Sequence, residues 1–208
     1  MRRKTSLGLI RAATHIGSLS PLATLIWDIS AQTLSVNPIQ DITVRTGKPA
    51  LILLVLTLAC TPINTFFGLK EILQIRRSLG LYTFTYTCLH FLVFVGIDYG
   101  FNASLLQEAI FKKPYALVGF LAFITLIPLA MTSNRKWMQR LGKHWKSLHR
   151  LIYITGPLVV IHYIWLVKSD IRQPLAFGAA IGLLLLARLP IVRSVARRMR
   201  VQLRRRKM

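Results

Sequence analysis

The sequence predicts an all-α membrane protein, a polytopic bundle of six transmembrane helices with both termini in the cytoplasm. Composition is the first indication, because the 208 residues are 53% hydrophobic and their mean hydropathy is +0.50. Charge is the second: only 16% of the residues are charged, against about 25% in an average soluble domain. The third is the distribution of those charges, which form blocks between long apolar runs.

Six segments are apolar enough, over about 20 residues, to cross a hydrocarbon core of about 30 Å. The first, 7–29, is the weakest because it contains Arg11, His15 and Pro21. The basic start of the chain resembles a signal peptide, but no small-residue cleavage site follows a clean apolar run, so we expect a retained helix. The other segments are 50–69, 79–97, 114–131, about 149–167 and 174–190.

Six spans place both termini and the second and fourth connections on one side of the membrane. That side carries 22 of the 28 basic residues, whereas five of the six acidic residues lie on the other side. The positive-inside rule then makes the basic side cytoplasmic. We expect a six-helix domain over 1–192 and a basic cytoplasmic tail over 193–208. Topology and attraction to anionic membrane lipid explain the net charge of +22, so we expect no nucleic-acid partner.

Several kinds of site are disfavoured by the residues that the spans contain. No internal repeat is evident, and Cys60 and Cys88 lie far apart without a C-x-x-C motif, as buried small side chains do. A proton-coupled transporter would normally need a carboxylate within a span, and Asp and Glu lie outside the spans or at their ends. No G-x-S-x-G motif indicates a serine hydrolase. The ionisable groups left within the spans are mainly histidines.

His90 and His162 lie inside apolar runs that cross the membrane in the same direction. The run of His90 starts at Leu79 and that of His162 at Leu151, so both histidines lie equally far into their runs. At about 1.5 Å per residue, both lie about 16 Å deep, near the midplane. Because neutral imidazole is a good axial ligand for heme iron, the pair predicts a heme held edge-on between two helices. The alternative is a pair of polar side chains that hydrogen-bond across a helix interface.

His149 is a third candidate heme ligand. It precedes His162 in the same segment by about 20 Å of helix, a spacing that suits a second, inner heme. Gly156-Pro157 predicts a kink between the two histidines, which would change their relative facing. The position at the same spacing before His90 is Arg77, so this second site lacks its histidine partner.

Two alternatives remain open for the residues on the cytoplasmic side. His144 or His15 would complete a site with His149, or His149 would contact propionates or another cofactor at the surface. Arg76, Arg77 and Arg150 are placed to bind heme propionates or a phosphate group. Their other role would be to orient the helices in the membrane.

Longer segments resemble a known family. They are "RRSLGLYTFTYTCLH" (76–90), "TSNRKWMQRLGKHWKSLHRLIY" (132–153), "IHYIW" (161–165) and "DITVRTGKPALILLVLTLACTPI" (41–63). Over about residues 7–192 the chain resembles the membrane subunit of the bacterial periplasmic methionine sulfoxide reductase system, in the ferric-reductase-like transmembrane group. The resemblance implies a multi-pass protein of the bacterial inner membrane with one or two b-type hemes and FMN. It also implies that His90, His149 and His162 are heme-associated.

The function that this resemblance implies is electron transfer across the inner membrane. The acceptor would be a periplasmic molybdopterin reductase subunit that repairs methionine sulfoxide in oxidised proteins, so we expect no catalytic residue for that reaction in this chain. No G-x-G-x-x-G or P-loop motif is present. We therefore expect quinol or a cytoplasmic flavin reductase as electron donor, with docking at the basic connection 132–150. A stand-alone transmembrane metalloreductase and a non-redox transporter or assembly factor remain alternatives.

Overall fold

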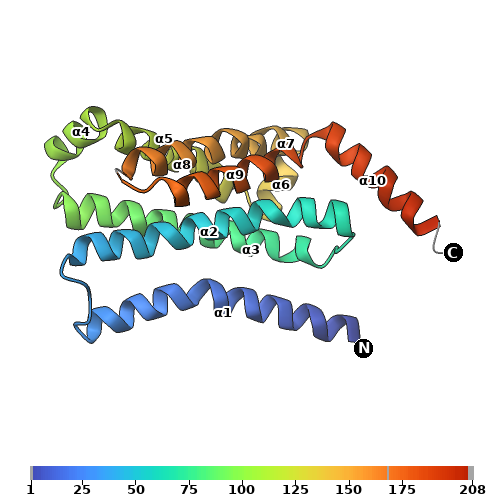
Figure 1. Cartoon of the computed structure of the whole chain (residues 1–208), viewed down its shortest axis with the longest axis horizontal. Coiled ribbons are helices and arrows are strands. Elements are labelled where there is room, and N and C mark those ends of the chain that lie inside the picture. Colours follow the sequence, from blue (N-terminus) through green and yellow to red (C-terminus); the bar gives the residue numbers. More distant parts are fainter. Residues whose placement is uncertain (1, 168, 206–208) are drawn as a thin grey trace.

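The computed structural model describes residues 2–167 and 169–205, and every regular element in this part of the chain is helical. Figure 1 shows long helices side by side, with α10 projecting from one end. The all-α prediction is confirmed. The elements are α1 (Arg2–Ser30), α2 (Pro38–Phe67), α3 (Ile72–Leu92), the π-helical turn η1 (Val93–Asp98), α4 (Ala103–Lys112), α5 (Pro114–Met131), α6 (Arg135–Leu141), α7 (Lys143–Leu148), the 3₁₀ turn η2 (His149–Leu151), α8 (Ile152–Leu166), α9 (Arg172–Leu186) and α10 (Pro190–Arg205).

Helices occupy all six segments that were predicted to span a membrane. By length and composition, α2, α3 continued by η1, and α5 qualify as spans within the described residues. A fourth arises if α9 and the start of α10, which meet at 75°, form one bent span. Helices α8 and α9 have 15 residues each and are therefore about 22 Å long, less than a hydrocarbon core of about 30 Å. Six spans and cytoplasmic termini stay predictions.

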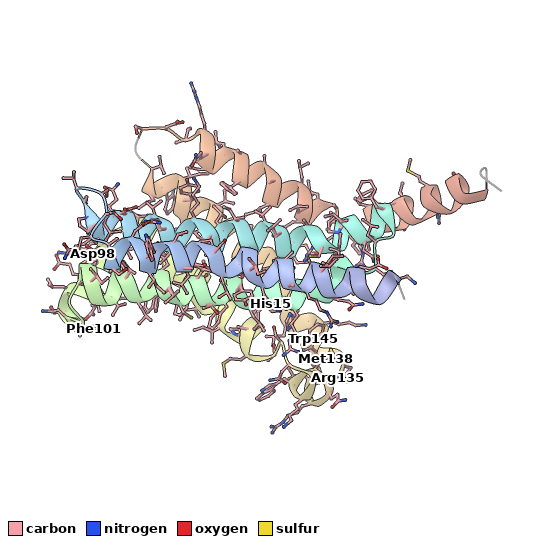
Figure 2. All side chains as sticks on the ribbon, turned by 90° about the horizontal axis from the view of Figure 1, so that it is seen from below. His15, Asp98, Phe101, Arg135, Met138 and Trp145 are labelled. Carbon is pink, nitrogen blue, oxygen red and sulfur yellow. The ribbon has the colours of Figure 1, made fainter. Side chains whose placement is uncertain are left out.

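The bundle has two ends, which we name after the helices found there. The α4 end contains the connection 31–37 and the segment 99–113, and the α10 end contains the connection 68–71 and the segment 132–151. Figure 2 shows Asp98 and Phe101 at the first end, Arg135, Met138 and Trp145 at the second, and His15 between them. Positive charge predicts that the α10 end faces the cytoplasm.

Helix α2 is central and contacts α1, α3, α9 and α10. Pro38 opens the helix, and the Asn37 side chain accepts a hydrogen bond of 3.2 Å from the backbone N–H of Gln40. Gly68 ends it in the left-handed conformation, at φ 77°. One buried apolar cluster joins α2 to α3 and a second joins it to α9. Their members are Ala50, Leu53, Cys60, Leu79 and Tyr86 in the first, and Leu51, Leu54, Leu58, Ile181 and Leu185 in the second.

Pro62 leaves one helical hydrogen bond of α2 unmade, and Arg188, at the junction of α9 and α10, supplies a replacement donor. Pro62 has no N–H, so the carbonyl of Leu58 lacks its usual helical donor. The guanidinium of Arg188 donates to this carbonyl from Nη2 at 2.9 Å and from Nε at 3.3 Å. It also donates to the carbonyl of Thr57 at 3.2 Å. This contact ties the bend between α9 and α10 to the central helix.

Helix α1 contacts both α2 and α3, and two tyrosines of α3 bond to it. The Tyr86 hydroxyl donates to the carbonyl of Ser18 at 2.8 Å and accepts from the backbone N–H of Leu22 at 3.0 Å. It therefore stands between two groups that would otherwise bond to each other in the helix. His15 shares a hydrogen bond of 2.9 Å with the Tyr82 hydroxyl. This histidine therefore serves the contact between α1 and α3.

Candidate functional site

Helices α2, α3, α5 and α8 surround a cavity of about 360 Å³. His90 of α3 and His162 of α8 both line it. Their ring centroids are 6.4 Å apart and their ring planes are 83° apart. The structure thus brings together the two histidines that the sequence paired by depth.

Both imidazoles are held through Nδ1 by a backbone carbonyl of a neighbouring helix, and Nδ1 of His90 also lies 3.4 Å from the Thr46 hydroxyl. Nδ1 of His90 donates to the backbone carbonyl of Thr43 at 3.0 Å, and Nδ1 of His162 donates to that of Tyr115 at 2.7 Å. Because a carbonyl oxygen only accepts, Nδ1 carries the hydrogen in each ring and Nε2 keeps its lone pair. Among the described residues, neither Nε2 atom has a hydrogen-bond partner. Histidines that bind metals are commonly oriented in this way.

A glycine leaves room for each ring. A Cβ atom added to Gly47 would lie 3.0 Å from Cε1 of His90, and one added to Gly119 would lie 2.6 Å from Nδ1 of His162. Gly47 follows Thr43, and Gly119 follows Tyr115, by about one helical turn. The carbonyl that accepts the hydrogen bond and the glycine that leaves space for the ring therefore lie on the same face of the helix. Helices α2 and α5 therefore each provide an acceptor and open space for an imidazole of the neighbouring helix.

The two halves of the site are the same arrangement, repeated at one constant offset in the sequence. The pairs of corresponding residues are Thr43 and Tyr115, Gly47 and Gly119, and His90 and His162. The pattern G-x-x-A-x-I-x-L occurs at both 47–54 and 119–126. A second pattern, L-x-x-x-T-x-x-x-x-x-x-H followed by an aromatic residue, occurs at both 79–91 and 151–163.

The packing of the two hairpins repeats in the same way. Thr83 and Thr155 are buried, and their hydroxyls donate to the carbonyls of Leu79 and Leu151, one turn earlier in each helix. The expectation that the chain has no internal repeat is therefore corrected, because α2 with α3 and α5 with α8 are two versions of one hairpin. Comparing the sequence with itself at this offset would have identified both glycines, which the analysis of single residues missed.

The residues around the cavity fit a heme bound by two histidines. Metal–imidazole bonds of about 2.0–2.1 Å on each side of one ion place the two ring centroids roughly 6 Å apart, and the distance here is 6.4 Å. Aromatic side chains line one wall, where the rings of Phe91 and Phe123 stack at 4.7 Å. Small side chains, including Thr87 and Ala122, line the cavity as well. Such walls suit a flat apolar macrocycle.

The histidine pair lies nearer the α4 end than the sequence indicated. Helix α3 continued by η1 runs over residues 72–98, so that His90 is much closer to the end of this helix than to its start. His162 likewise lies in the second half of α8, close to its end at Leu166. The difference arises because α3 begins before its apolar run and α8 ends soon after His162.

His149 lies at the α10 end, away from this pair. Its Nε2 donates to the Thr132 hydroxyl at 3.1 Å, because that hydroxyl donates its own hydrogen to the carbonyl of Pro128 at 2.6 Å. The ring of Trp145 covers it at a centroid distance of 4.1 Å. The ring nitrogen that is free in the cavity pair is therefore occupied in His149.

The structure does not complete a second histidine pair at His149. His15 bonds to Tyr82 instead, and His144 is exposed on α7. Within residues 2–167 and 169–205, no cluster of three or more His, Cys, Asp or Glu side chains is arranged to hold a metal ion. The interpretation of His149 as a heme ligand thus finds no partner residue in the described part of the chain.

The three candidate propionate ligands lie outside the cavity. Arg76 donates from Nη1 to the Thr61 hydroxyl at 3.1 Å, and neither Arg76, Arg77 nor Arg150 lines the cavity. Lys48 does line it, although this residue precedes the predicted segment 50–69. The structure begins α2 at Pro38 and so places Lys48 inside the helix.

Comparison with known proteins identifies the family of the chain. The family model described as ferric reductase like transmembrane component matches residues 46–160, a range that includes His90 and ends before His162. No solved structure matches the chain.

Three relatives illustrate the closer similarity. Proteins of Xanthomonas axonopodis pv. citri (strain 306) and Xanthomonas campestris pv. campestris (strain B100) are 42% and 40% identical to this chain over 191 residues, covering 88% of this chain and 87% of each relative. A protein of Herminiimonas arsenicoxydans is 40% identical over 185 residues, covering 88% of this chain and 85% of its own. All three are named protein-methionine-sulfoxide reductase heme-binding subunit MsrQ. The chain therefore belongs to the ferric reductase like transmembrane family and, within it, to the MsrQ heme-binding subunits of protein-methionine-sulfoxide reductases.

Proposed function

We propose that this protein is a membrane electron-transfer subunit that holds one b-type heme between His90 and His162. The observation that carries the proposal is the pair of imidazoles whose Nδ1 atoms are tied to helix carbonyls and whose Nε2 atoms have no other partner among the described residues. When bound, heme iron supplies a reversible one-electron carrier. The names of the relatives, which describe heme-binding subunits, support this function.

The electrons would leave the protein at the α4 end. The histidine pair lies toward that end, and the distribution of Lys and Arg predicts that this end faces outward from a bacterial inner membrane. An acceptor in the periplasm could then approach the heme more closely than a cytoplasmic protein could. In this proposal the acceptor is a molybdopterin-containing reductase subunit that repairs methionine sulfoxide in periplasmic proteins.

The electrons would enter at the α10 end, from quinol or from a cytoplasmic flavin reductase. The segment 132–150 lies at this end and is rich in basic residues, of which Arg135, Lys136 and Arg140 are exposed on α6. Clustered positive charge attracts an acidic protein surface and accelerates its association. An FMN cofactor is part of the proposal on the strength of the sequence resemblance alone.

The test combines spectra, stoichiometry and turnover of the purified protein in detergent. We expect a b-type α-band in the reduced-minus-oxidised spectrum and one heme per chain in a pyridine hemochrome assay. The reduced protein should be reoxidised by the reductase subunit with methionine sulfoxide, and not by methionine sulfoxide alone. Equally fast reoxidation by a ferric chelate without any partner would favour the metalloreductase. Protein without heme from heme-replete cells would favour a transporter or assembly factor.

A further inference from the structure

The cavity around His90 and His162 is polar at one end and apolar at the other. Toward the α4 end it is lined by Asp98 of η1 and Gln173 of α9, and the Tyr163 hydroxyl donates to Oε1 of Gln173 at 3.1 Å. Lys48 of α2 lines it one residue after Gly47, level with His90, and its Cα–Cβ bond tilts toward the start of α2, at the α4 end. Toward the α10 end the lining is mainly Leu54, Leu126 and Thr83, and the Thr83 hydroxyl is bonded to its own helix. Heme has the same asymmetry, because both of its carboxylates lie on one edge of an apolar ring system.

Lys48 differs from the other described cations at the α4 end in having no partner. Three of those cations are paired: Arg45 with Asp28 at 2.6 Å, Lys112 with Glu108 at 2.8 Å, and Lys113 with the Tyr99 hydroxyl at 2.7 Å. Arg172 lies 4.0 Å from Asp170. Among the described residues, no hydrogen bond or ion pair reaches Lys48. This lysine lies well inside a helix that is apolar enough to span a membrane, where an ionisable side chain usually has a function.

Asp98 also lines this end of the cavity, and its negative charge would repel the carboxylates of a heme there. Among the described residues, no ion pair joins it to Lys48. Lys48 lines the cavity with an exposed, unpaired side chain, next to the glycine that makes room for His90.

We infer that Lys48 binds the heme propionates and thereby fixes the heme with its propionate edge toward the α4 end. This inference rests on the proposed function, because it requires a heme between His90 and His162. It assigns the propionates to the end of the bundle opposite to Arg76, Arg77 and Arg150. Lysine donates charge-assisted hydrogen bonds to carboxylates, which are stronger than neutral ones. Heme bound this way presents its propionate edge to the face where the acceptor would dock.

The test compares heme with its dimethyl ester, in which both propionates are neutral. Each form is loaded into full-length protein in detergent, and its rate of transfer to excess apomyoglobin is measured. We expect Lys48→Met to release heme about tenfold to a hundredfold faster than the wild type, the range for one lost charge-assisted hydrogen bond. Lys48→Arg should retain heme nearly as well as the wild type. The control is Lys112→Met, which removes an exposed lysine of α4 at the same end, outside the cavity lining.

With the dimethyl ester, wild type and Lys48→Met should release the ligand at equal rates. Wild-type protein should also release the ester faster than heme, a comparison that needs no variant. Two results would overturn the inference. In the first, Lys48→Met releases heme no faster than the wild type; in the second, it releases heme and the dimethyl ester faster by the same factor. Either result leaves the proposed function standing if His90→Ala removes the heme. Failure of the wild type to bind heme at all would contradict the proposed function itself.

Discussion

The imidazoles of His90 and His162 face one cavity with their ring centroids 6.4 Å apart, and each is oriented through Nδ1 by a carbonyl of a neighbouring helix. The two rings come from helices that occupy the same position in two copies of one hairpin. The duplicated hairpin therefore provides two equivalent ligands whose orientation depends on backbone atoms of α2 and α5, without any carboxylate to hold them.

Replacing either histidine of the cavity by alanine should abolish heme binding, because one remaining axial imidazole leaves the iron without its second ligand. His90→Ala and His162→Ala should both lack the b-type α-band and contain almost no heme in a pyridine hemochrome assay. His144→Ala, which removes an exposed histidine of α7, serves as the control and should keep the wild-type spectrum. Wild-type heme content in both cavity variants would exclude this pair as the ligands.

Gly119→Ala should weaken heme binding without removing any polar group. The new Cβ would lie 2.6 Å from Nδ1 of His162, so the ring must move away from the carbonyl of Tyr115 that orients it. Overpacking of this kind costs about 1–3 kcal/mol, or roughly a tenfold to hundredfold loss of affinity.

The measurement for Gly119→Ala is heme titration of the protein together with its low-temperature electron paramagnetic resonance spectrum, which reports the relative orientation of the axial rings. Gly182→Ala in α9 is the matched control, because no atom lies within 4 Å of its added Cβ. Equal affinity and identical spectra for Gly119→Ala and the wild type would show that the ring tolerates the methyl group.

His149→Ala should leave one heme per chain in place. Nε2 of His149 is bonded to Thr132, and no second histidine reaches it among the described residues, so its loss removes no cavity ligand. The measurement is heme per chain and the midpoint potential of the His90–His162 heme. Two hemes per chain in the wild type, falling to one in His149→Ala, would mean that a second heme binds at the α10 end.

Arg188→Met should destabilise the fold, because the buried carbonyl of Leu58 loses the donor that replaces the missing N–H of Pro62. An unsatisfied buried polar group costs about 1–3 kcal/mol. The measurement is unfolding in detergent by added dodecyl sulfate, followed by circular dichroism.

Pro62→Ala supplies the control for this effect, since alanine restores a backbone N–H to the helix. In the Pro62→Ala background, Arg188→Met should therefore cost less than it does in the wild type. An equal cost in both backgrounds would show that Arg188 stabilises the protein in some other way. Arg172→Met, at an exposed position of α9, should have little effect in either background.

Much of the architecture can be read from local patterns in the chain. Apolar segments of membrane length fall where the structure has α1, α2, α3, α5, α8 and α9, because hydrophobicity over about 20 residues is a local property. The pairing of His90 with His162 follows from their equal spacing within two such segments, since a helix converts sequence position into depth. Their depth near the midplane stays a prediction, and the structure shows only that both lie closer to the α4 end of their helices, because the ends of a helix need not coincide with the ends of its apolar run.

The contacts between helices were decided only by the tertiary structure. Gly47 and Gly119 matter because of the rings that pack over them, and nothing local to either glycine indicates which ring approaches. From the sequence, Lys48 lies in the connection before the segment 50–69. In the structure α2 already begins at Pro38, so that Lys48 belongs to the helix and lines the cavity. The role of His149 as a ligand stays a prediction, and the contacts of its ring with Thr132 and Trp145 are visible only in the structure. Sequence periodicity specifies which residues share a helix face, whereas the side chain opposite that face depends on how the helices pack.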